Sequence, residues 1–303
     1  MVPAERGAAA TLGGPDGLGQ TVTDAAASAH AIAAATGTQF SAPATLVVRV
    51  RLAGQAETTR VSLTRLVSTC GGPRVEFDQA APAVGPWAAG PDHAMPYLSY
   101  SVGDVDDTVQ NLQRAGWHLQ AKADGTLAYL TAGGLTARVI NAKLAPAGAG
   151  TNQSPAPIDF GAPIAGAIFP CNIPAAQAAL TKGMGITWRA PQVFSLTWQL
   201  ADGSTVEHTA TGTISQQGPP YPTTEEPHGF PGEDPCNATY TPHYLVFVAP
   251  GGDVAAADAQ MQAAGLRFIA RALAPDGSEL IAAYRGPGGA SVEAVSPVFM
   301  PAS

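Results

Sequence analysis

Basic residues are scarce in this chain, and lysine is the scarcest. The 303 residues include 15 lysines and arginines against 23 aspartates and glutamates, which gives a formal net charge of -8. Lysine occurs only at Lys122, Lys143 and Lys182. A protein that binds nucleic acid needs clustered positive charge to neutralise phosphates. The sequence therefore predicts no nucleic-acid partner.

Cysteine is also rare, with only Cys70, Cys171 and Cys236. Their number is odd, they lie far apart, and none has the CxxC spacing that is typical of zinc sites. The sequence therefore predicts neither a disulfide framework nor a zinc cluster, and we expect buried, unreactive thiols.

Long apolar runs and several catalytic motifs are missing. No stretch reaches the roughly 18 apolar residues of a membrane helix, and the N-terminus has no continuous apolar core like that of a signal peptide. A soluble cytoplasmic protein without a membrane partner is expected. The sequence contains no GxSxG, P-loop, Rossmann fingerprint or HExxH, which disfavours serine hydrolases, nucleotide-binding proteins and metalloproteases.

The composition is that of a globular protein. Hydrophobic residues make up 46% of the chain and the mean hydropathy is +0.08. With 303 residues the chain can bury one large core or two ordinary ones, and two domains are favoured.

The clearest pattern lies in residues 242–297. Apolar residues follow strand spacing from Tyr244 to Val248 and helical spacing from Val254 to Ala264, and three strand-like runs then end at Val295. Glycine-rich turns separate these segments. The pattern predicts a βαβββ module.

Three further copies of this module precede it. The first has a strand at 18–22 and a helix at 24–37 that Asp24 can cap and Gly37 can end, and the second spans 96–142. The third, which begins near Ile164, has the weakest pattern. Gly72 and Pro73 lie as far before Val102 as Gly218 and Pro219 lie before Val248, which indicates a duplicated chain.

A segment rich in proline, alanine and glycine separates the second and third copies. Residues 143–157 have no apolar period, as expected of an interdomain linker. We therefore predict an N-terminal domain at 1–142 and a C-terminal domain at 158–303.

The fourth copy resembles a half-domain of the vicinal oxygen chelate superfamily, which includes glyoxalase, bleomycin-resistance proteins and extradiol dioxygenases. The resemblance rests on His243 at the head of a strand, on the aspartate, helix and glycine that follow, and on a glycine-rich turn before Val292, Glu293 and Ala294. It implies an α+β fold in which four βαβββ modules form two tandem glyoxalase-like, cup-shaped domains. In that family, metal ligands come from the first and last strands of each module.

The family's ligand positions in the C-terminal domain correspond to about Ile164, about Pro222 or Thr223, His243 and Glu293. Only His243 and Glu293 can bind a metal, and the resemblance implies a divalent zinc, iron, manganese or nickel ion there. Such ions usually take three or more protein donors, so a further donor is sought among the following nearby side chains: Glu207, His208, Glu225, Glu226 and His228. Alternatively, His243 and Glu293 form a hydrogen-bonded or ionic pair that lines a metal-free cavity.

In the N-terminal domain the corresponding positions are Gly17, Glu76, Tyr97 and Arg138. We predict that Arg138 takes the place of the metal and pairs with Glu76, with Tyr97 nearby. A fixed guanidinium can hold a carboxylate or enolate oxygen as a metal would. The alternative is a degenerate domain that serves as scaffold.

The family contains isomerases, lyases, dioxygenases, thiol transferases and binding proteins, so the fold alone does not select an activity. The leading hypothesis is an enzyme of isomerase or lyase type that acts on a small oxygenated metabolite in the C-terminal cup. His243 and Glu293 would support acid/base or metal-assisted enolisation there. The alternative is a metal-free small-molecule binding or resistance protein, or a biosynthetic cyclase, that uses the same cavity. A monomer or a homodimer is expected.

Overall fold

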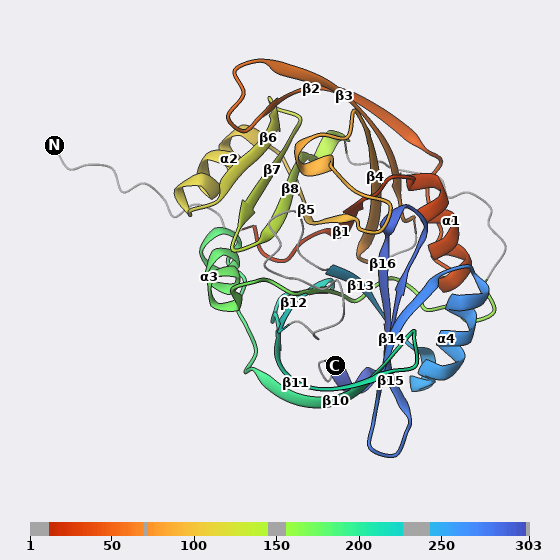
Figure 1. Cartoon of the computed structure of the whole chain (residues 1–303). Helices are drawn as coiled ribbons and strands as arrows, with labels where there is room; N and C mark the ends of the chain where they lie inside the picture. The colour runs from red at the N-terminus through yellow and green to blue at the C-terminus, as the bar shows by residue number, and fades with distance from the viewer. Residues whose placement is uncertain (1–11, 70–71, 145–155, 227–242, 301–303) are drawn as a thin grey trace.

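Two closed barrels make up the part of the chain that the computed structural model describes, residues 12–69, 72–144, 156–226 and 243–300. In Figure 1 the N-terminal barrel lies at the top and the C-terminal barrel at the bottom, with helices at both sides. Each described barrel has eight strands, contributed by two βαβββ modules.

The N-terminal barrel contains modules one and two. Module one consists of β1 (Gly17–Thr21), α1 (Ala25–Thr36), β2 (Ala44–Leu52), β3 (Thr58–Val67) and β4 (Arg74–Ala81). Module two consists of β5 (Met95–Val102), α2 (Val105–Arg114), β6 (His118–Ala123), β7 (Leu127–Ala132) and β8 (Leu135–Asn141).

The C-terminal barrel contains modules three and four. Module three consists of β9 (Ala165–Ile168), α3 (Ile173–Met184), β10 (Gln192–Leu200), β11 (Thr205–Ile214) and β12 (Tyr221–Glu225). Module four consists of β13 (His243–Val248), α4 (Val254–Ala263), β14 (Arg267–Leu273), β15 (Glu279–Arg285) and β16 (Ser291–Val295).

The strand order is the same in both barrels. Around the first it is β1-β4-β3-β2-β6-β7-β8-β5, in which β1 runs parallel to β4 and antiparallel to β5. In the second, β9 runs parallel to β12 and antiparallel to β13. The predicted α+β fold of four βαβββ modules in two tandem cups is therefore confirmed. The predicted linker at 143–157 lies mostly outside the described residues, so the domain boundaries stay a prediction.

Local sequence signals set the helix ends. The Asp24 carboxylate accepts a hydrogen bond from the Ala27 backbone N–H at 2.9 Å, and Gly37 ends the helix with a φ of 79°. Asn172 and Gly185 cap α3 in the same way. These residues satisfy backbone groups that a helix end leaves without partners, which is why the predicted ends of α1 are correct.

Three apolar clusters hold the described fold together. Each barrel interior holds one of them. The largest cluster joins the outer faces of both barrels with residues of all four helices. Figure 1 shows α1 beside α4 and α2 beside α3, and both pairs are in contact. The two barrels therefore share one core rather than meeting at a polar interface.

Cysteine chemistry differs from the expectation. Cys171, in the turn between β9 and α3, is exposed and disulfide-bonded, so the prediction of a buried free thiol is wrong for this residue. Its two candidate partners in the sequence, Cys70 and Cys236, lie outside the described residues. An odd cysteine count excludes complete pairing but not a single bond.

The helices of the described segments include none with the length and hydropathy needed to span a bilayer. The expected cytoplasmic location stays a prediction.

A buried polar contact also joins the barrels. The Gln20 side-chain amide on β1 donates to the Ser291 carbonyl oxygen on β16 and accepts from the Ser291 backbone N–H, both at 3.0 Å. Gln20 is fully buried and Ser291 is 3% exposed. The Gln20 side chain thus supplies two hydrogen bonds to the Ser291 backbone, as a neighbouring strand would.

We expect Gln20→Ala to lower the free energy of unfolding by about 2 kcal/mol, because it leaves both backbone groups of Ser291 buried without a partner. Denaturant unfolding followed by circular dichroism measures the change. Gln55→Ala, in an exposed turn of the same barrel, is the matched control and should change stability little. Equal effects of the two substitutions would contradict the assigned role of Gln20.

Candidate functional site

A cluster of charged side chains fills the interior of the N-terminal barrel. Arg65 on β3, Glu76 and Asp78 on β4, and Arg138 on β8 are each at most 4% exposed. Strand alternation brings them together, since Glu76 and Asp78 are two residues apart and face the same side of β4. Two guanidinium groups thus meet two carboxylates away from water.

Each arginine contacts both carboxylates. Arg65 donates to Glu76 at 2.9 Å and to Asp78 at 3.0 Å. Arg138 donates to Asp78 at 2.8 Å and also contacts Glu76 directly. The predicted Glu76–Arg138 contact is therefore present, but as part of a four-membered ionic network rather than a pair.

Hydroxyl groups complete this network. Tyr97 donates to Asp78 at 2.8 Å and accepts from Arg138 at 3.0 Å, so the predicted proximity of Tyr97 is also present. The Ser99 hydroxyl accepts from Arg138 and donates to Glu76. Tyr129 donates to Asp78 at 3.2 Å. Most of the hydrogen-bonding capacity of the carboxylates is thus used within the cluster.

The pKa of Glu76 reflects this environment. Burial alone would raise it, but the positive charges of Arg138, Arg65 and Arg74, with the Ser99 hydrogen bond, lower the pKa to about 2. Glu76 is therefore ionised at neutral pH. Burial raises the pKa of Tyr97 well above its ordinary value, which keeps the phenol protonated.

The equivalent positions in the two barrels follow from strand pairing. Arg138 and Glu293 each lie four residues after a Gly-Gly turn, and their β-neighbours are Ser99 and Val246. Two residues before these neighbours on β5 and β13 come Tyr97 and Tyr244. The structure thus places Tyr244, and not His243, at the position equivalent to Tyr97, which corrects the predicted register by one residue.

The same pairing extends to the other charged positions. Asp78 lies beside Arg65, and its equivalent Glu225 lies beside Gly212. Glu76 corresponds to Thr223. The positions of the network residues Arg65 and Arg138 are thus occupied by Gly212 and Glu293 in the C-terminal barrel.

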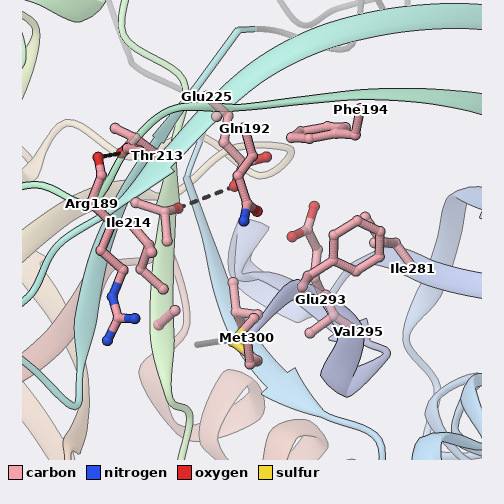
Figure 2. Close-up of a pocket in the computed structure, with 16 residues that line it drawn as sticks. Arg189, Gln192, Phe194, Thr213, Ile214, Glu225, Ile281, Glu293, Val295 and Met300 are labelled. Atoms are coloured by element: carbon pink, nitrogen blue, oxygen red, sulfur yellow. Dashed lines mark hydrogen bonds between the residues drawn. The ribbon is translucent and has the colours of Figure 1, made fainter. Parts of the chain in front are cut away.

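A cavity of about 210 Å³ occupies the C-terminal barrel where the N-terminal barrel holds its ionic network. Its polar lining includes Arg189, Gln192, Thr213, Thr223, Glu225 and Glu293. Its apolar lining includes Phe194, Ile281, Val295, Phe299 and Met300. Figure 2 shows the Glu293 carboxylate pointing into the pocket, with the Arg189 guanidinium at the opposite side of the view.

The two carboxyl groups of this pocket differ in setting. Glu293 is 4% exposed and lies on β16, whereas Glu225 is half-buried at the end of β12. Burial raises the pKa of Glu225 to about 7, although a hydrogen bond from Thr223 at 3.2 Å acts in the opposite direction. Glu225 therefore exchanges its proton near neutral pH.

The predicted C-terminal donors are only partly brought together. Glu293, Thr223 and Glu225 line the pocket, while Glu207 and Glu226 are exposed and neither they nor His208 is among the lining residues.

The predicted partnership between His243 and Glu293 depends on a side chain outside the described part of the structure. The backbone of His243 pairs with Ile168 on β9, and Val246 is the residue beside Glu293. The His243–Glu293 partnership stays a prediction.

The metal hypothesis can be tested against the described donors. Within the described residues, no three His, Cys, Asp or Glu side chains lie close enough together to hold a metal ion. Beside Glu293, β13 presents the apolar Val246. The described donors therefore do not provide the three strong ligands of a zinc, iron, manganese or nickel site.

Sequence reasoning missed Arg65 and Asp78, and it considered Glu225 only as a candidate metal donor. A signal was present, because Arg65 shares its strand phase with Val61 and Leu63, which face the interior. A charge in the apolar phase of a strand indicates a buried partner.

We expect Arg138→Met to lower the free energy of unfolding by about 3–5 kcal/mol, because it leaves Arg65 as the one buried guanidinium of the network, with the partly exposed Arg74 at 3.9 Å from Glu76. Chemical denaturation measures this change. The loss should shrink in acid, because a lowered carboxyl pKa stabilises the fold only above the pH at which Glu76 is protonated. Arg60→Met, on the exposed face of β3, is the matched control. A loss at Arg138 no larger than at Arg60 would contradict the role of the network.

Ionisation of Glu225 should weaken the fold as the pH rises from about 4.5, its ordinary pKa, to about 7. Glu225→Gln should therefore be more stable than the wild type at pH 8, by on the order of 2 kcal/mol after discounting for partial exposure, and similar to it at pH 4.5. Thermal melting across this range measures the difference. Glu207→Gln, an exposed substitution on β11, should follow the wild-type curve. A constant offset between Glu225→Gln and wild type would contradict the assigned titration.

Comparison with known proteins supports the fold. No family model and no curated protein matches the sequence. Among solved structures, a triple mutant of 4-hydroxymandelate synthase from Streptomyces coelicolor is similar, with 13% identity, a TM-score of 0.56, and coverage of 94% of this chain and 93% of that chain. The 2,3-dioxygenase LapB from Pseudomonas sp. KL28 matches with 12% identity, a TM-score of 0.49, and coverage of 94% and 93%. At such identities the similarity concerns architecture alone. The chain therefore has the tandem four-module fold of the vicinal oxygen chelate proteins, as its sequence predicted.

Proposed function

We propose that the chain is an enzyme that acts on a small oxygenated molecule in the C-terminal cup by proton transfer. The observation that carries this proposal is the cavity that Glu225 and Glu293 line together, at the position where the other barrel is filled by its ionic network. At about 210 Å³ the cavity is smaller than the roughly 300–1,000 Å³ of pockets for drug-sized ligands. The substrate is correspondingly small.

The two carboxyl groups take different roles. Glu293, on β16 and almost fully buried, is the base that removes a proton from carbon beside a carbonyl group. Glu225, with a pKa of about 7, contacts the substrate as either a hydrogen-bond donor or a negative charge. Two carboxyl groups in unlike surroundings are a known means of separating base from binding group. His243 remains the proposed partner of Glu293.

The reaction type follows from this arrangement. Proton removal beside a carbonyl forms an enolate, and return of the proton at a neighbouring atom gives an isomer, whereas loss of a leaving group gives a lyase reaction. Gln192 and Thr213 line the same pocket and supply neutral donors for an oxygen that gains negative charge. The apolar wall around Phe194 and Ile281 excludes water from the substrate.

The N-terminal network serves as a structural centre rather than a second active site. Arg138, Glu76 and Tyr97 are at most 2% exposed, and they satisfy one another. A substrate would have to break a charge-balanced network to reach them, at a cost of several kcal/mol. The scaffold interpretation of this domain is therefore favoured over a catalytic one.

We expect the protein to exchange the hydrogens beside the carbonyl group of small hydroxyketones with deuterium from the solvent. The wild type would be incubated with hydroxyacetone or acetoin in D₂O, and deuterium uptake would be followed by NMR. Glu293→Gln should slow catalysed exchange by at least about a hundredfold, as expected for loss of a general base. Glu207→Gln should retain the wild-type rate.

Pretreatment with EDTA separates two versions of this chemistry. Exchange that survives EDTA assigns proton removal to the carboxyl groups alone. Exchange that returns only with added zinc, iron, manganese or nickel, and that is lost in His243→Ala, assigns it to a metal-assisted site instead. Binding of these ketones without exchange in any form would overturn the enzymatic proposal and favour the alternative of a small-molecule binding protein.

A further inference from the structure

We infer that the N-terminal barrel positions Glu293 in the C-terminal cup, and that Gln20 is the main positioning residue. The inference rests on the proposed function for the catalytic role of Glu293, and it concerns the control of that same site. It makes the two barrels one working unit, in which the barrel with the ionic network holds the strand that carries the base of the other.

The segment concerned is the turn that leads into β16. The turn η4 (Pro287–Gly289) is followed by Ala290 and then by β16, and Glu293 is the third residue of that strand. Figure 1 shows this end of the β15–β16 hairpin beside α1, and α1 contacts η4. The entry to the strand of Glu293 therefore lies against the other barrel.

The N-terminal half of the chain binds three successive carbonyl groups of this turn. The donors are two backbone N–H groups and one hydroxyl group. The donor–acceptor distances are 2.7 Å from the Ser28 hydroxyl to Pro287, 3.1 Å from the Thr23 N–H to Gly288, and 3.1 Å from the Ala94 N–H to Gly289. Each carbonyl group of the turn thus has a partner on the other barrel.

Gln20 extends this contact into β16 itself. Its side chain binds both the N–H and the carbonyl oxygen of Ser291, each at 3.0 Å. Among the described residues of β13, Leu245 is the first to pair with β16, at Val292. The Gln20 side chain therefore takes the place of a strand neighbour two residues before Glu293.

The glycines of the turn allow a close approach between the barrels. A Cβ atom at Gly288 would lie 2.9 Å from the Asp24 backbone nitrogen, and one at Gly289 would lie 2.7 Å from the His93 carbonyl carbon. Real Cβ contacts are not this short, so any side chain would push the turn away. The turn is thus seated directly on the backbone of the N-terminal barrel.

The duplicated half repeats this arrangement in reverse. Gly133 lies five residues before Arg138, as Gly288 lies five residues before Glu293. A Cβ atom at Gly133 would lie 2.6 Å from the backbone of Ala176, in the first turn of α3. Each barrel thus receives the turn of the other at the N-terminal end of a helix, which makes this contact part of the duplicated plan.

The position of a general base decides its rate. The base must lie within hydrogen-bond reach of the proton that it removes, and a displacement of about 1 Å can cost about a hundredfold in rate. Loss of the two bonds to Ser291 frees the entry of β16 and displaces Glu293. This loss should lower kcat and leave KM nearly unchanged, because Gln20 does not line the cavity where the substrate binds.

The first test is independent of activity. Amide hydrogen exchange of the full chain, followed by NMR, should be at least about tenfold faster at Ser291 in Gln20→Ala and in Gln20→Met, which keeps the side-chain volume. Ser68→Ala is the matched control. It removes another buried side-chain bond to the backbone, which the Ser68 hydroxyl accepts from the Val75 N–H at 2.9 Å, and should leave Ser291 unchanged.

The second test measures deuterium exchange of hydroxyacetone or acetoin at a temperature at which every variant is fully folded. Both Gln20 variants should lose at least about tenfold in kcat, with KM within about twofold of the wild type. Ser68→Ala should retain both values. An unchanged kcat in the folded Gln20 variants, or an equal loss of kcat in Ser68→Ala, would overturn the inference.

Ser28→Ala keeps the inference testable if the Gln20 variants do not fold. It should lower kcat by about threefold. The smaller effect is expected because the Ser28 hydroxyl also lies 2.7 Å from the Asp24 carbonyl oxygen and is shared between two acceptors. A kcat equal to that of the wild type would then count against the inference.

These outcomes are separable from those of the proposed function. If the wild type exchanges no ketone hydrogen, the proposed function fails, and amide exchange at Ser291 still decides whether the N-terminal barrel holds β16. If ketone exchange depends on Glu293 but not on Gln20, the proposed function stands and the inference fails.

Discussion

Charge compensation inside a closed barrel is the constraint on which both halves of this protein depend. A carboxylate or guanidinium that faces a barrel interior has left bulk water, and it needs an opposite charge or several hydrogen bonds to remain ionised. In the N-terminal barrel Arg65 and Arg138 answer Glu76 and Asp78, so these four positions carry no net charge. Their equivalents in the C-terminal barrel include no basic residue, and the raised pKa of Glu225 is the physical consequence of burial there. The same fold thus has an interior filled by an ionic network in one barrel. In the other barrel, the interior contains a glutamate whose protonation changes near neutral pH.

The shared core explains how such different interiors can coexist. All four helices contribute to one apolar cluster between the barrels, and Gln20 joins β1 to β16 through two hydrogen bonds. Burial in this cluster stabilises the outer faces of both barrels regardless of what fills their interiors. The C-terminal barrel can therefore keep a cavity of about 210 Å³, whose lining forgoes packing contacts, while its outer face remains anchored. The stabilising apolar contacts therefore lie on the outer face of the strands, and the cavity lies on their inner face.

Strand alternation made the fold and part of the site predictable. The βαβββ pattern recurs four times, and the glycine turn before Arg138 matches the one before Glu293. The contact between Arg138 and Glu76 was predicted from the ligand positions of the family that the sequence resembles. Three features were not available from such patterns. The partner role of Arg65 depends on register between β3 and β4, which spacing along one strand does not reveal. Matching Tyr97 with His243 in the sequence shifted the comparison by one residue, because strand pairing decides that Tyr244 is the equivalent of Tyr97. The bond at Cys171 depends on proximity in space alone.

Two glycines show how little separates the filled barrel from the open one. A Cβ atom at Gly19 would lie 1.9 Å from the Tyr97 ring, so glycine there lets the phenol reach Asp78 and complete the packed network. A Cβ atom at Gly212 would crowd Glu225 and Phe194, so glycine there lets these two side chains lie close to the backbone of β11. Neither position has a positive φ, and both act through volume rather than backbone freedom. Because the strand order is the same in both barrels, the difference between the filled interior and the interior with a cavity lies in side-chain size and charge at a few inward positions. A duplicated fold can therefore hold a packed ionic network in one copy and a cavity in the other without altering its backbone plan.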